Sequence, residues 1–316
     1  MKIAEIISYL ETIAHPSLQE DYDNAGLITG AAGWDCTGAI ISLDATQAVI
    51  AEAMDKKCNL VIAHHPIVFK GLKKINGKNY VEQTIIKAIK NDIAIYAIHT
   101  NLDNVRQGVS GMMADKLGLI NCSILAPKQD LLKKLVVFVP LQQAAQVRNA
   151  IFEAGAGHIG NYSECSFNTA GTGTFKAGEG SKPFIGEIGK QQQEDEIKIE
   201  TIFPAWLENT IFTALKAAHP YEEVAYDILP LANTHNHIGA GIVGELPAAM
   251  DETFFLKQIK EIFRVPVIRH TPLTGRQVKR VAVCGGAGSF LISNATCVPV
   301  CSDCKFLHMK KLTVGS

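Results

Sequence analysis

Short apolar runs of strand length alternate with helical stretches along residues 1–125, and this alternation constrains the fold more than any other feature of the sequence. Continuous apolar runs are typical of parallel strands that are buried on both faces. Right-handed helical crossovers join such strands, so helices cover both faces of the sheet. The predicted strands are 39–42, 60–63 and 93–98. The predicted helices are an amphipathic N-terminal helix, 46–56 and 81–90.

The pattern is interrupted in the middle of the chain. Between residues 131 and 232 the predicted elements follow the order β-α-β-β-α-β, which is that of a ferredoxin-like module. After residue 239 the first pattern returns, with strands at 241–246, 266–269 and 279–284 and a helix at 251–263.

We therefore predict an α/β protein in which a discontinuous outer α/β domain with a mixed sheet is interrupted by a ferredoxin-like α+β insert. The expected boundaries are 1–130 for the first part of the outer domain, 131–232 for the insert, 233–295 for the second part and 296–316 for an aberrant tail.

Composition argues against several classes of protein. A formal net charge of −1 over 316 residues argues against general electrostatic binding to nucleic acid. No apolar window of about 18 residues occurs, so no membrane span is expected. Glu5 and Glu11 interrupt the apolar pattern of the N-terminus, which is unlike a secretory signal and predicts a cytoplasmic protein. The scattered cysteines at 36, 58, 122, 165 and 284 are expected to be buried small hydrophobic residues.

Two adjacent histidines, His64 and His65, follow the predicted strand 60–63 and precede Pro66. Adjacent residues of a regular strand point to opposite faces, so both can reach one site only if the chain leaves the strand there. Neutral imidazoles are good ligands for divalent transition metals. The alternative is that one histidine forms a hydrogen bond in the core while the other is solvated.

Two neighbouring strand ends carry compatible side chains. His99 and Asp103 follow the strand predicted at 93–98, and Asp44 follows the one at 39–42. Because parallel strands end at the same edge of a sheet, Asp103 and His99 can approach the histidine pair. A carboxylate balances the charge of a cation held by two histidines and can bridge two ions. Asp21 and Asp23, taken alone, are more typical of a turn.

Several short motifs occur in order along the chain. In the outer domain they are 21–26 (DYDNAG), 42–46 (SLDAT), 63–66 (AHHP) and 99–103 (HTNLD). In the insert they are 155–160 (GAGHIG), 183–186 (PFIG) and 219–227 (HPYEEVAYD). With these motifs, residues 1–295 resemble the YbgI/YqfO-like dinuclear metal proteins, the GTP cyclohydrolase I type 2 homologues. The match is to the form whose inserted domain is similar to PII and CutA proteins.

This resemblance implies that His64, His65 and Asp103 are metal ligands and that each subunit binds two divalent ions. Zinc, iron, manganese, cobalt and nickel all suit histidine and aspartate ligands. The resemblance also implies a homohexameric ring whose metal sites face an interior cavity.

Two functions are compatible with such a site. The first is metal-dependent hydrolysis or ring opening of a small, nucleotide-like or phosphoester substrate, as the name GTP cyclohydrolase implies. Asp44, Thr100 or Asn101 would then orient the attacking water. The second is a non-catalytic scaffold or metallochaperone whose insert recruits a partner. Neither function requires a membrane or direct contact with nucleic acid.

The resemblance further implies a histidine near the C-terminus and a glutamate four residues later, and neither is recognisable here. We therefore expect the chain to lack the last strand and helix of the fold and to bind metal weakly. Two accounts of the tail stay open. In one, a zinc site forms from Cys297, Cys301, Cys304 and His308. In the other, the reading frame has changed, because possible codons of residues 302–307, read one base later, can encode Val-Thr-Ala-Asn-Phe-Tyr.

Overall fold

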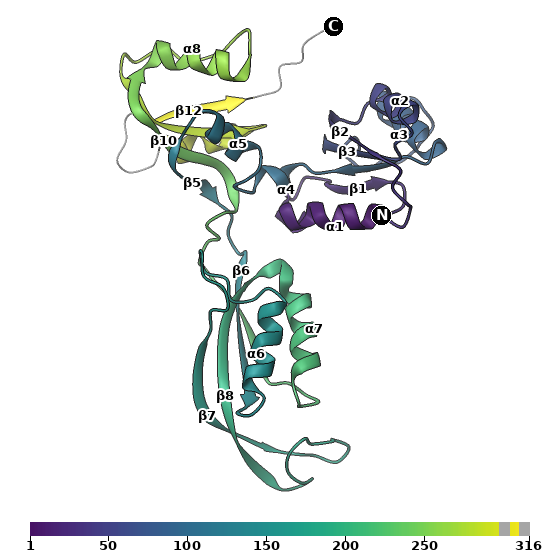
Figure 1. Ribbon diagram of the computed structural model, residues 1–316, viewed down its shortest axis with the longest axis vertical. Helices are drawn as coiled ribbons and strands as arrows, with labels where there is room; N and C mark the ends of the chain where they lie inside the picture. The colour runs from purple at the N-terminus through teal and green to yellow at the C-terminus, as the bar shows by residue number, and fades with distance from the viewer. Residues whose placement is uncertain (297–303, 310–316) are drawn as a thin grey trace. The chain divides into compact units, whose positions relative to one another are not determined.

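The strand predicted at 60–63 forms an interior strand of the first sheet. In the computed structural model, which describes residues 1–296 and 304–309, residues 60–63 are at most 9% exposed. The sheet has the order β1-β4-β3-β2, with β2, β3 and β4 parallel and β1 antiparallel to β4 (Figure 1). It is therefore mixed. Its strands are β1 (Gly26–Thr29), β2 (Ala39–Asp44), β3 (Leu60–His65) and β4 (Ala94–Ala97).

Capping side chains set where two helices of this sheet begin. Thr46 accepts a hydrogen bond from the N–H of Val49, and Asn79 accepts one from the N–H of Glu82. The apolar faces of these helices then pack against the sheet in one buried cluster. The helices of this part are α1 (Ile3–Ile13), η1 (Pro16–Leu18), α2 (Gln47–Asp55) and α3 (Tyr80–Lys90). Among the described residues, no helix is both long and apolar enough to cross a membrane.

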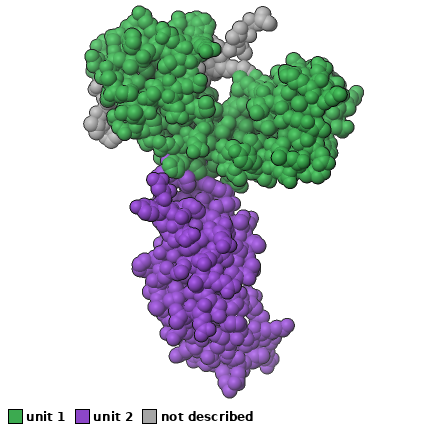
Figure 2. All heavy atoms as spheres, viewed as in Figure 1, with its two compact units in different colours: residues 1–127, 237–316 green, residues 128–236 purple. Residues whose placement is uncertain are grey.

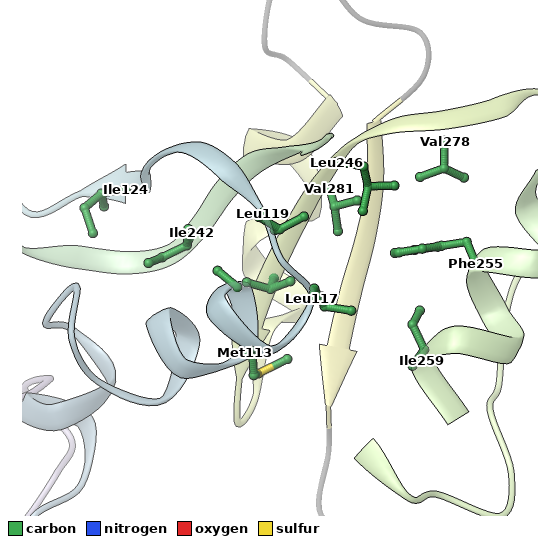
Figure 3. Close-up of a cluster of buried hydrophobic side chains, with 12 residues drawn as sticks. Met113, Leu117, Leu119, Ile124, Ile242, Leu246, Phe255, Ile259, Val278 and Val281 are labelled. Atoms are coloured by element: carbon green, nitrogen blue, oxygen red, sulfur yellow. The ribbon is translucent and has the colours of Figure 1, made fainter. Parts of the chain in front are cut away.

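The chain that returns after residue 239 builds a second sheet, of order β12-β11-β10-β5. Strand β5, which precedes residue 128, pairs antiparallel with β10, which follows residue 236. Figure 3 shows the Phe255 ring pointing from α8 toward Leu246 and Val281, within the cluster that α5 closes from the other side. The elements are α4 (Thr100–Asp103), α5 (Val109–Lys116), β5 (Ile120–Pro127), β10 (Gly239–Asp251), α8 (Glu252–Phe263), β11 (Gln277–Gly285), η3 (Gly288–Leu291), α9 (Ile292–Thr296) and β12 (Cys304–Met309).

The strand predicted at 266–269 is absent, and that prediction was wrong. The segment between α8 and β11 is a loop whose Pro266 has no N–H to donate to a ladder. The buried Glu252 carboxylate holds the loop instead, because it accepts hydrogen bonds from the N–H groups of Thr274 and Gly275, both at 2.8 Å.

A strand is present in the segment expected to be an aberrant tail. Strand β12 pairs in parallel with β11, from Arg280 opposite Cys304 to Gly285 opposite Met309. The side chains of the expected zinc site at Cys297, Cys301, Cys304 and His308 lie outside the described part of the structure. The side chains of residues 302–307, on which the reading-frame account depends, also lie outside it.

Residues 128–236 form one compact unit, and residues 1–127 with 237–316 form the other (Figure 2). The elements of the 128–236 unit follow the order β-α-β-β-α-β, and its antiparallel sheet has the order β7-β8-β6-β9. Helices α6 and α7 lie together on one face of this sheet and bury Val137, Ile151 and Leu215 (Figure 1). The elements are β6 (Leu132–Pro140), α6 (Ala144–Glu153), β7 (Phe167–Lys176), β8 (Gln191–Pro204), η2 (Ala205–Leu207), α7 (Glu208–Ala218) and β9 (Tyr226–Pro230).

Candidate metal centre

Three histidines meet at the carboxyl ends of β3 and β4. The ring centroids of His64 and His65 are 4.9 Å apart, and that of His99 lies 5.3 Å from His64 and 5.4 Å from His65. One ring nitrogen of each histidine lies within 4.8 Å of the others. Since β3 and β4 pair in parallel, their ends come to the same edge and bring these side chains together.

The Nδ1 atom of each imidazole is already engaged. His64 Nδ1 lies 2.9 Å from the carbonyl oxygen of Ile98, His65 Nδ1 lies 2.8 Å from Asp44 Oδ1, and His99 Nδ1 lies 2.7 Å from Asp23 Oδ1. With Nδ1–H donating to these acceptors, Nε2 keeps its lone pair. This is the usual state of metal-binding histidines, whose second nitrogen donates to a carbonyl or carboxylate.

Asp103 approaches the histidines from α4, the single turn that follows His99. Its Oδ1 lies 3.8 Å from Nε2 of His64, beyond hydrogen-bonding distance. This oxygen is buried and has no hydrogen-bond partner among the described residues, an unfavourable state for a carboxylate. Burial raises the pKa of Asp103 to about 6, although His99 and His65 oppose the shift. A carboxylate oxygen without a hydrogen-bond partner, near three imidazoles whose Nε2 atoms keep their lone pairs, suits the binding of a divalent cation.

The protonation state of His64 also suits a ligand. Burial, reinforced by the neighbouring His65 and His99, lowers the pKa of His64 to about 4. The imidazole is therefore neutral at neutral pH, and a cation need not displace a proton from it.

The remaining predicted site residues support the ligands. Asp44 binds His65, and the hydroxyl of Thr100 donates to Asp23. Asn101 is fully buried, with its amide donating to the carbonyl of Ala14 and its oxygen accepting from the N–H of His99. The polar side-chain atoms of Thr100 and Asn101 are thus engaged within the protein, as is Oδ1 of Asp44.

The second sheet also reaches the centre. A methyl group added to Gly285 would lie 3.7 Å from Oδ1 of Asp103, and one added to Gly286 would lie 3.7 Å from Oδ2. Cys284, directly before them, is buried, and its pKa is raised to about 11 by burial and by the Asp103 carboxylate. This thiol is therefore protonated at neutral pH. The glycine-rich turn after β11 thus forms one wall of the centre.

Two aromatic side chains flank the histidines on the exposed side. The ring of Phe69 lies 6.3 Å from that of His99 and 6.2 Å from that of Tyr22, between centroids. Phe69 is 44% exposed and Tyr22 is 62% exposed. Large exposed rings beside a polar site offer a flat apolar surface to a ligand.

His99 was expected at this edge but not as a ligand, and Asp23 was expected to be a turn residue. The aromatic wall was not expected at all. The carboxylate that fixes His99 could have been suspected only from the polar cluster before β1, since its partner lies far away in the chain.

Known proteins resemble this chain over most of its length. A family model described as Duf34/NIF3 (NGG1p interacting factor 3) matches residues 1–300. The GTP cyclohydrolase 1 type 2 homolog of Halalkalibacterium halodurans is 44% identical over 299 residues, covering 93% of this chain and 80% of that protein. The Bacillus subtilis protein of the same name is 41% identical over 292 residues, covering 92% and 78%. The crystal structure of a Bacillus cereus protein related to NIF3 matches with a TM-score of 0.86 at 39% identity, covering 99% of this chain and 83% of that one.

Proposed function

Because the chain belongs to the Duf34/NIF3 family and three histidines and a buried aspartate converge in it, we propose that it is a divalent-metal-dependent hydrolase. The family predicted from the motifs is confirmed by the relatives. One observation carries the proposal: Oδ1 of Asp103 is buried without a partner beside imidazoles whose Nδ1 atoms are already engaged.

His64, His65, His99 and Asp103 would hold the cation. A divalent ion bound there would supply Lewis acidity and lower the pKa of a water molecule. Asp44 and Asp23 orient the imidazoles of His65 and His99 and increase their basicity. We propose two ions per chain, since a carboxylate such as that of Asp103 is able to bridge a pair.

The proposed substrate is a small molecule with a planar ring, such as a nucleotide. Both relatives named above are called GTP cyclohydrolase 1 type 2 homolog, which makes GTP the first compound to test. In this chain, Phe69 and Tyr22 would stack against the ring while the histidine side of the centre faces the bond to be cleaved.

A comparison of matched histidine variants tests this function. GTP and a panel of phosphoesters would be incubated with metal-loaded protein, and products would be separated by chromatography. We expect turnover by the wild type, its loss in His99→Gln, and wild-type turnover in His158→Gln, which changes an exposed histidine of the other unit. Turnover unchanged in His99→Gln would contradict the proposal. Bound, exchangeable metal without any turnover would instead favour a metal-binding scaffold or metallochaperone.

We further propose that the 128–236 unit is a ferredoxin-like insert of the PII/CutA kind. Its β-α-β-β-α-β order and its sheet order β7-β8-β6-β9 support this. The homohexameric ring stays a prediction of the family resemblance, and the cytoplasmic location stays a prediction from the N-terminal sequence. Native mass spectrometry of the whole chain tests the ring, with six chains expected and a monomer contradicting it.

A further inference from the structure

The 128–236 unit contains a cavity of about 680 Å³ that shares no residue with the metal centre. Glu196 and Lys198 of β8 line it, whereas Ile199, the next residue of the same strand, packs into the core under the helices. Since strand residues alternate between faces, the cavity lies on the sheet face opposite α6 and α7. The rest of its lining comes from Phe138 and from residues 169–178, 181–184, 221–223 and 225.

Four aromatic residues line this cavity: Phe138, Phe175, Phe184 and Tyr221. The ring centroid of Tyr221 lies 6.0 Å from that of Phe175 and 6.3 Å from that of Phe184, with interplanar angles of 59° and 55°. Phe184 is 52% exposed, so an apolar face remains available to a ligand. Tilted rings at this spacing present several π-faces to one volume.

A fixed carboxylate lies against the aromatic rings. Oε1 of Glu196 accepts a hydrogen bond of 3.1 Å from the hydroxyl of Tyr221. Gly173 leaves the space that this carboxylate needs, since a methyl group there would lie 2.3 Å from Glu196 Oε2. Burial and the nearby Glu196 and Glu194 raise the pKa of Tyr221, so its hydroxyl remains a donor at neutral pH.

Within residues 1–296, no lysine or arginine is paired with Glu196. Among the described residues, it forms no ion pair, whereas Lys198 in the same lining binds Glu200 at 3.1 Å. The other two lining lysines, Lys176 and Lys182, are exposed. Glu196 therefore presents a partly buried negative charge to a volume walled by aromatic rings.

We propose that this cavity binds a small organic ammonium ion. Aromatic faces attract cations through their quadrupole, and the attraction grows when the cation is desolvated. The Glu196 carboxylate would supply the compensating charge, and Tyr221 would hold it in place. The cavity volume is in the range that accommodates a small metabolite.

Choline and its uncharged isostere 3,3-dimethylbutan-1-ol have similar shapes, so comparing them shows whether binding depends on the positive charge or on apolar contact alone. A third probe, 1,5-diaminopentane, tests a primary ammonium. Binding to the whole chain would be measured by isothermal titration at low salt and by saturation-transfer NMR. We expect at least one ammonium probe to bind, and to bind at least tenfold more tightly than the uncharged isostere. Binding of the isostere as tight as that of choline, or no binding of either ammonium probe, would overturn the proposal.

Three variants assign the site. Glu196→Gln keeps the acceptor for Tyr221 but removes the charge, and it should weaken binding at least tenfold. Glu153→Gln makes the same charge change on α6, on the other side of the sheet, and should bind like the wild type. Tyr221→Phe keeps the ring and should retain binding within about threefold, because the aromatic face carries the attraction. Equal binding by Glu196→Gln and Glu153→Gln would contradict the assignment, whatever the effect on folding.

Discussion

The Nδ1 atom of His99 lies 2.7 Å from Oδ1 of Asp23, a residue 76 positions away in the sequence. The Asp23 side chain is fully buried, and its other oxygen accepts a hydrogen bond of 3.0 Å from the N–H of Thr100. Burial acts to raise the pKa of Asp23, but the hydrogen bonds from His99 and Thr100 outweigh it, so the pKa is lowered. The carboxylate thus stays ionised and holds His99 with its Nε2 available to a cation.

Asp23→Asn should therefore weaken metal binding by about 10- to 100-fold, since it replaces the charged acceptor that orients His99. Competition with a chromophoric chelator would give the affinity. Asp21→Asn, which changes an exposed carboxylate two residues earlier, is the matched control and should bind like the wild type. Equal affinities of the two variants would show that Asp23 does not position the ligand.

Asp103→Asn should stabilise the metal-free protein and abolish metal binding. The buried, unpartnered oxygen destabilises the metal-free fold, so the neutral amide should raise the free energy of unfolding by about 1 kcal/mol while metal binding is lost. Urea unfolding with chelator present, followed by Trp34 fluorescence in a Trp206→Phe background, would report on this unit. A metal-free variant less stable than the metal-free wild type would contradict the interpretation of Asp103 as a metal ligand whose oxygen lacks a partner without the cation.

Glu252→Gln should loosen the loop before β11. The carboxylate is 4% exposed and accepts hydrogen bonds from the backbone of Thr274 and Gly275, so its replacement should destabilise this part by about 1–3 kcal/mol. Trypsin should then cleave after Arg269 faster than in the wild type. Glu261→Gln, an exposed position on the same helix, should leave the cleavage rate unchanged.

His219 should make the stability of the 128–236 unit depend on pH. Its Nε2 lies 3.0 Å from the carbonyl of Phe138, and its Nδ1 accepts from the N–H of Tyr221, an arrangement that only the neutral ring allows. Burial lowers the pKa of His219 below its ordinary value of 6.5. Below pH 6.5 the unfolded chain therefore binds more protons than the folded one, and stability should fall as the pH falls toward the lowered pKa.

Trp206 fluorescence in a Trp34→Phe background would follow this unit during urea unfolding between pH 5 and 8. His219→Gln should flatten the pH dependence in that range, whereas His158→Gln, at an exposed histidine, should not. An unchanged slope in His219→Gln would assign the dependence to other groups.

The central strands were predictable because they are buried on both faces and are therefore continuous apolar runs. Strand β5 was missed because its exposed positions carry polar residues such as Asn121, and the four residues of β1 are too few to show a period. The strand expected at 266–269 is absent because Pro266 cannot donate to a ladder, and Glu252 binds the same loop further along, at Thr274 and Gly275.

At the candidate site, the residue types and the common sheet edge were sufficient to bring His64, His65, His99 and Asp103 together. The support of these ligands was not predictable, because it depends on contacts between distant segments. Nothing near Asp23 in sequence identifies His99 as its partner, and nothing near Thr100 and Asn101 shows that both side chains are buried.

Metal content per chain tests the central claim most directly. The protein would be purified without chelators and analysed by elemental mass spectrometry beside His64→Gln, His99→Gln and His158→Gln. We predict bound divalent transition metal in the wild type and in His158→Gln, with a large loss in the two ligand variants. Metal content that is the same in all four proteins, or absent from the wild type even after incubation with zinc or manganese, would contradict the account.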